Sequence, residues 1–143
     1  GSKKPTETDE ETNKIFRNNA LIGGKLYNIS EMGFTVELVG KEDLDGKEVY
    51  KLNLTDKDGV VSNFFIDAGS YLISKTIGKV TRMGNEIITE NSYSNYKKVN
   101  DVMISYLMEQ KASGTQNESQ TVSIDKVELN AEIDDNIFKM PSE

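Results

Sequence analysis

The sequence predicts an α+β, mainly β domain: one short N-terminal helix followed by an antiparallel up-and-down sheet of about seven strands. Three observations predict this class. Apolar and polar residues alternate over several runs, as in a sheet with one buried face. Turn-forming pairs such as Asp45-Gly46 and Asp58-Gly59 separate these runs at intervals of 10 to 16 residues. The only prolines, Pro5 and Pro141, lie outside the runs, and proline would interrupt a central strand.

The N-terminal region divides into a linker and a helix. Residues 1–9 are predicted to be a tag remnant and a disordered linker, because the stretch from Lys3 to Asn13 contains no apolar residue. From Glu10 to Leu26 apolar residues fall near helical spacing, and Gly23-Gly24 supplies a C-terminal stop. Residues 10–143 are therefore predicted to form a single domain, as suits a chain of 143 residues.

The strands are placed by alternation and by the turns between them. The predicted strands cover residues 34–40, 48–56, 60–67, 71–82, 86–98, 102–110 and 121–130. Residues 111–120 are polar and are predicted to form a mobile loop. The apolar residues of the last strand change parity along it, so a bulge is predicted near Asp125-Lys126.

Composition excludes most catalytic chemistry. The chain has no cysteine and no histidine, which removes disulfides, thiolate nucleophiles, Ser-His-Asp triads and zinc sites built from His or Cys. The run Asp56–Gly59 resembles part of a calcium loop, but Leu54 and Phe65 stand where that loop needs acids, so a polar hairpin tip is expected. Asp134 is expected to cap a short C-terminal turn. We therefore expect no enzyme activity, no catalytic residue, no metal site and no cofactor.

Charge and hydropathy exclude two further classes of partner. The chain carries 17 basic and 24 acidic residues, a net charge of −7. Nucleic acid and anionic membrane surfaces need clustered Lys and Arg, so neither is an expected partner. No apolar run approaches the roughly 18 residues of a membrane span, so no transmembrane segment is expected.

One face of the predicted sheet is strongly apolar. If Asp58-Gly59 forms a tight two-residue turn, parity puts Val61 and Phe65 on the face of the second predicted strand's apolar residues. One short helix cannot cover seven strands, so a missing segment, a partner or an apolar ligand is expected on this face. The predicted ligand-binding residues are Phe34, Val36, Tyr50, Leu52, Leu54 and Phe65. The alternative reading makes the same six residues ordinary core beneath the helix.

Several segments of the chain follow one another in an order and spacing typical of a known family: Gly33–Glu42, Val49–Leu52, Asp58-Gly59, Phe65–Asp67, Tyr93–Val99 and Ile133–Pro141. Over residues 20–141 they resemble the C-terminal half of the LolA-like superfamily of periplasmic carriers of outer-membrane lipoproteins. The resemblance implies a strongly curved half-barrel whose concave face takes acyl chains beneath covering helices. It also implies a domain that is partial relative to the family, whose N-terminal strands have no counterpart here.

The apolar face and the resemblance together suggest a function. We expect non-catalytic binding of an apolar acyl-chain ligand or a lipoprotein on the curved sheet, in the periplasm or cell envelope of a bacterium. The alternative is a protein-interaction or envelope-sensing module, in which the face or a sheet edge docks a polypeptide.

A homodimer is also expected, through edge-to-edge pairing or through the meeting of two apolar faces. The first strand would be an unprotected edge, since Glu37 is the only charge between Phe34 and Gly40. The opposing possibility is a monomer in which Asn13–Leu26 folds back across the face.

Overall fold

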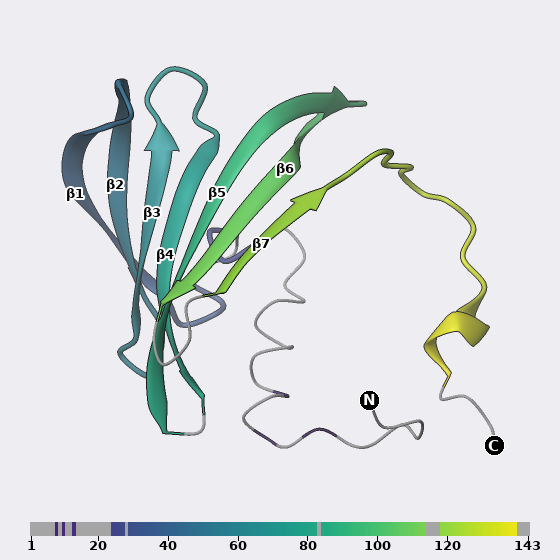
Figure 1. Ribbon diagram of the computed structural model, residues 1–143, viewed down its shortest axis with the longest axis horizontal. Helices are drawn as coiled ribbons and strands as arrows, with labels where there is room; N and C mark the ends of the chain where they lie inside the picture. The colour runs from purple at the N-terminus through teal and green to yellow at the C-terminus, as the bar shows by residue number, and fades with distance from the viewer. Residues whose placement is uncertain are drawn as a thin grey trace.

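The computed structural model describes residues 8, 10, 13, 24–27, 29–82, 84–113 and 118–139. Figure 1 shows seven strands in a twisted, curved sheet that stays open, with β1 and β7 at opposite ends. The strands pair in sequence order and every pair is antiparallel, so the predicted meander is confirmed. They are β1 (Thr35–Leu44), β2 (Lys47–Thr55), β3 (Val61–Asp67), β4 (Ile73–Arg82), β5 (Asn85–Val99), β6 (Val102–Ser113) and β7 (Glu118–Ser123).

Glu10 and Asn13 are helical, and the one complete helical element within the described ranges is a 3-10 turn, η1 (Asp135–Phe138). Asp134 caps it, because its carboxylate accepts a hydrogen bond from the backbone N–H of Asn136 at 2.9 Å. This confirms the capping role predicted for Asp134. The predicted helix over Glu10–Leu26 and the predicted linker over residues 1–9 lie almost wholly outside the described residues.

The turn between β1 and β2 shows why the sequence folds into hairpins. Asp45 and Gly46 both have positive φ, 53° and 80°, which is the backbone of a type I′ turn. Only this mirror-image turn matches the right-handed twist of the strands that it joins. Leu44 and Lys47 pair directly across it.

Two predicted details of the strands are wrong. The polar connection is shorter than residues 111–120, because β6 continues to Ser113 and β7 begins at Glu118. There is no bulge near Asp125-Lys126, since β7 ends at Ser123. The parity change in the sequence therefore records the chain leaving the sheet after Ile124, whose N–H still donates to the carbonyl of Tyr106 at 2.9 Å. The first strand instead carries an irregularity, a register shift between Leu38 and Gly40.

The buried side chains lie on both faces of the sheet. The least exposed apolar residues are Val49, Leu54, Phe64, Phe65 and Tyr106. Phe64 and Phe65 are neighbours in β3 and point to opposite sides, yet each is only 6% exposed. A single sheet thus holds a small core on each face.

Candidate functional site

The register of the strands defines one face as apolar. Residues directly opposite each other on neighbouring strands point to the same side of a sheet. Leu52 lies opposite both Leu38 and Phe64, and Leu54 lies opposite Val36. We call this group the β1–β3 patch: Val36, Leu38, Tyr50, Leu52, Leu54 and Phe64.

The same face continues across the rest of the sheet. Phe64 lies opposite Thr76, and Thr76 lies opposite Asn91, so Tyr93, two residues further along β5, shares their side. Met108 lies opposite both Tyr93 and Val122. Tyr93, Met108 and Val122 therefore form a second apolar group, the β5–β7 row.

A polar ladder also runs along this face from β4 to β6, beside the β5–β7 row. The side-chain amide of Asn91 donates to the hydroxyl of Thr76 at 3.3 Å, and the amide of Gln110 donates to Asn91 at 2.9 Å. These hydrogen bonds satisfy amide groups that would be costly beside apolar neighbours if left unpaired. Hydrogen-bonding groups are thus available on this face next to Tyr93 and Met108.

Phe65 and Val61 lie on the opposite face of the sheet. The prediction that both belong to the apolar face is therefore wrong. Lys51 stands opposite Phe65, and Thr55 stands opposite Val61. The loop between β2 and β3 contains five residues rather than a two-residue turn at Asp58-Gly59, which moves the register by one. A slip of one residue transfers every side chain of a strand to the other face.

Asp56 explains the longer loop. Its carboxylate accepts hydrogen bonds from the backbone N–H groups of Asp58 and Val60, both at 2.9 Å. The backbone N–H of Gly59 also donates to the carbonyl of Asp56 at 2.9 Å. The turn therefore begins at Asp56 and not at Asp58. The polar hairpin tip expected for Asp56–Gly59 is confirmed.

The five other predicted residues differ in exposure. Leu54 is 2% exposed and belongs to the core, whereas Val36 at the edge of the sheet is 45% exposed. Phe34, Tyr50 and Leu52 are half-buried. Phe64 was missed in favour of Phe65, because the two adjacent residues exchange faces with the length of the loop before them.

A small hollow lies at the Leu54 end of the patch. Phe34 and Leu54 meet there with Val60 and Ser62, and Lys25 and Asp56–Asp58 complete the lining. Its volume is about 40 Å³, whereas pockets for small molecules enclose roughly 300–1,000 Å³. The hollow suits one or a few waters, so any larger apolar ligand would lie on the open face.

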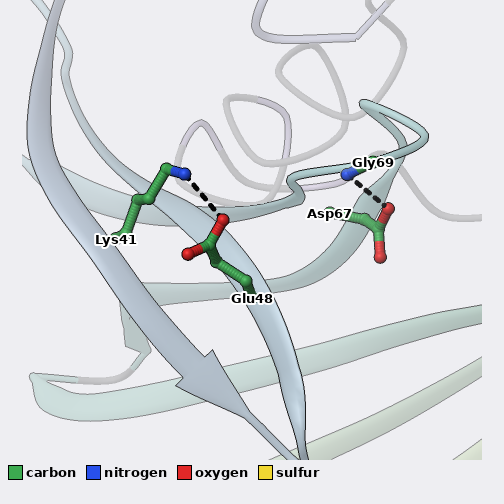
Figure 2. Close-up of polar contacts among 4 residues, drawn as sticks. All are labelled: Lys41, Glu48, Asp67 and Gly69. Carbon is green, nitrogen blue, oxygen red and sulfur yellow. Dashed lines mark hydrogen bonds and ion pairs between the residues drawn. The ribbon is translucent and has the colours of Figure 1, made fainter.

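Tyr50 forms the other end of the patch. Its ring is nearly parallel to that of Tyr71, with an interplanar angle of 7° and centroids 6.3 Å apart, and the ammonium of Lys41 lies 5.1 Å from its centroid. Lys41 also pairs with Glu48 at 2.6 Å, and this hydrogen bond raises the pKa of the lysine (Figure 2). Aromatic and cationic groups therefore border the apolar surface here.

The loop that carries Tyr71 is fixed by Asp67. The Asp67 carboxylate accepts hydrogen bonds from the N–H of Ser70 at 2.7 Å, the hydroxyl of Ser70 at 2.8 Å and the N–H of Gly69 at 3.1 Å (Figure 2 shows the last). These donors hold the pKa of Asp67 below its ordinary value. They also support a positive φ of 59° at Tyr71, an unusual backbone for a bulky residue.

The opposite face carries ion pairs around Phe65. Lys51 and Lys75 stand on either side of Phe65 in the register. Their ammonium groups pair with Glu42 at 2.9 Å and Glu90 at 2.8 Å. The lysine stems therefore cover the Phe65 ring while their charges reach carboxylates, and the ammonium of Lys51 lies 5.6 Å from the ring centroid. By register Val61, Ile77 and Ile88 also share this face, so its described residues mix apolar side chains with ion pairs, whereas the members of the β1–β3 patch are all apolar or aromatic.

No metal or membrane feature accompanies the apolar face. Within the described residues no three Asp or Glu side chains gather as a metal ion would require. Among those residues there is also no helix both long enough and apolar enough to cross a membrane. What the described site can supply is apolar contact, with hydrogen bonds from the polar ladder.

Comparison with known proteins gives one structural likeness. No family model matches the chain, and no curated protein matches it. A crystal structure from Vibrio parahaemolyticus, described as an outer membrane lipoprotein-sorting protein domain, aligns at 17% identity with a TM-score of 0.46. The alignment covers 68% of this chain and 45% of that chain. The chain thus spans less than half of the length of that domain.

Proposed function

We propose that this protein binds an apolar acyl chain, free or attached to a lipoprotein, on the apolar face of its sheet, without catalysis. The observation that carries the proposal is the contrast between the two faces. One face presents the β1–β3 patch and the β5–β7 row, while lysine–glutamate pairs occupy the other. An acyl chain gains roughly 0.8 kcal/mol per buried CH₂ and needs no directional contact for it.

The polar ladder gives the proposed ligand an orientation. An acyl chain ends in a carboxyl, ester or amide group, which needs hydrogen-bonding partners when it leaves water. Asn91 and Gln110 supply amide groups next to the apolar residues, so the head of the ligand lies near them and its tail lies along the patch. The segment order that resembles LolA-like carriers adds support and suggests a periplasmic or cell-envelope location.

The experiment compares two leucines on opposite faces. Leu52 on the patch and Leu107, which faces Ser94 and Ser123 on the other side, are both half-buried in inner strands. The probe is a dansyl-labelled fatty acid that palmitate can displace. We expect Leu52→Gln to weaken its binding by about tenfold or more, because a polar side chain then contacts the acyl chain. Leu107→Gln should leave binding within about twofold, and equal losses from both variants would contradict the proposal.

Native mass spectrometry of protein extracted from its host supplies an independent test. A co-purifying fatty acid, phospholipid or lipidated protein supports the proposal. A co-purifying polypeptide without a lipid, together with no binding of the labelled fatty acid, would replace it with a protein-interaction module.

A further inference from the structure

The outer edge of β1 is open. In the part of the chain that the structure describes, β1 pairs with β2 alone, and apolar side chains along it are exposed: Val36 by 45%, Leu38 by 59% and Val39 by 50%. An edge strand presents unpaired N–H and C=O groups that can pair with another strand. The other edge differs, because β7 has six residues, of which Val122 alone is apolar.

The devices that usually protect an edge are confined to the second half of β1. The side chains of Lys41 and Glu42 are directed inward, to Glu48 and Lys51 on β2. The register shift after Leu38 bends the strand there, and such irregularities limit edge pairing. The first half, from Thr35 to Leu38, has no proline, no lysine and a single charge at Glu37.

We propose that two copies of this chain pair through this half of β1, as a two-fold antiparallel dimer centred on Val36. In this register Val36 meets its own copy, Thr35 meets Glu37, and Phe34 meets Leu38. Every opposed pair then joins residues of the same face, as an antiparallel ladder requires. The apolar row formed by Val36 and Leu54 becomes continuous with that of the second copy.

Neighbouring registers are less favourable. Centring the dimer on Glu37 places two carboxylates directly opposite each other, which destabilises a strand pair. Centring it on Leu38 brings Val36 opposite Gly40, where the register shift has already reversed the faces. Charge and strand geometry therefore both select Val36.

Single cysteines test the register directly, because the chain has none of its own. Directly opposed residues of an antiparallel pair have Cα atoms about 4.5–5.5 Å apart, within the roughly 4.4–6.8 Å that a disulfide spans. We expect Val36→Cys to form a covalent dimer under mild oxidation at least tenfold faster than Glu37→Cys. Val61→Cys is the matched control, since Val61 is 44% exposed but lies on the inner strand β3. Equal rates for all three variants, or fastest cross-linking of Glu37→Cys, would overturn the proposed register.

Light scattering coupled to size exclusion tests the dimer without a thiol. We expect the mass to rise with concentration from 16.0 kDa toward twice that value. Val36→Lys should remain at the monomer mass, because it would place two ammonium groups against each other at the two-fold axis of the dimer. Val61→Lys is the control and should dimerise as the unmodified chain does. A mass that stays at 16.0 kDa from about 1 μM to 1 mM, or equal dimerisation of both variants, would refute the proposal. This test does not depend on the proposed ligand.

Discussion

The adjacent residues Phe64 and Phe65 allow a direct test of the two-sided core. Both lie in β3 and both are 6% exposed, but they point to opposite faces of the sheet. A sheet with one solvated face would tolerate Phe65→Ala. The structure instead predicts that Phe65→Ala and Phe64→Ala destabilise the protein by similar amounts.

The expected size follows from burial. Replacing a buried phenylalanine by alanine costs about 3–5 kcal/mol, from lost transfer free energy and from the cavity left behind. Phe65→Ala also removes the contact with the Lys51 ammonium, 5.6 Å from the ring centroid, for about 0.5–1 kcal/mol more. With an unfolding entropy of about 2.1 cal/mol/K per residue over 143 residues, the melting temperature should fall by roughly 10–17 °C for Phe64→Ala and by roughly 12–20 °C for Phe65→Ala.

Urea and thermal unfolding, followed by circular dichroism, measure both variants. Val61→Ala is the control, because Val61 shares the face of Phe65 but is 44% exposed, and it should cost less than about 1 kcal/mol. A cost below about 1 kcal/mol for Phe65→Ala, beside the full cost for Phe64→Ala, would refute the lysine-covered core around Phe65.

Three further changes have defined outcomes. Hydrogen bonds from Ser70 and Gly69 lower the folded pKa of Asp67 below its unfolded value of 3.8, so the protein loses stability as the pH falls through the folded pKa. Asp67→Asn should remove this loss, so the urea midpoint of the variant should change less with pH over the same acidic range. Tyr96→Phe removes a 2.7 Å hydrogen bond from the tyrosine hydroxyl to the carbonyl of Ile73 and should cost about 1 kcal/mol in urea unfolding. In the unmodified protein burial raises the pKa of Tyr96, so the absorbance of this tyrosine should titrate above pH 10.0. Gly46→Ala should cost about 1–2 kcal/mol in thermal unfolding, because φ is 80° there and a Cβ is strained whatever the space around it.

Local signals were sufficient to predict the strand order. Alternation between turn pairs such as Asp45-Gly46 depends on residues close in sequence, and such patterns survive without tertiary information. Tyr93 and Tyr96 are three residues apart in β5, and they oppose Met108 and Ser105, which lie on different sides of β6, as strand alternation requires.

The membership of each face was harder to predict, because it depends on counting the residues of a loop. Asp56, Asp58 and Gly59 are all turn formers, and the sequence does not state which of them begins the turn. The hydrogen bonds of Asp56 make it the first residue of the turn. This shifts the β2–β3 register by one residue from the predicted one, and so places Phe64 on the apolar face in place of Phe65. The path of the chain beyond Ser123 was likewise not predicted, because a change of parity fits both a bulge within a strand and the end of that strand.

The meander topology has a consequence for synthesis and unfolding. Every strand pairs only with its neighbours in sequence, so each hairpin can close as soon as its second strand has left the ribosome. In the described sheet no early strand waits for a distant partner, and β4, with three strands on either side, is released last. Amide hydrogen exchange should accordingly be fastest in the edge strands β1 and β7 and slowest in β4.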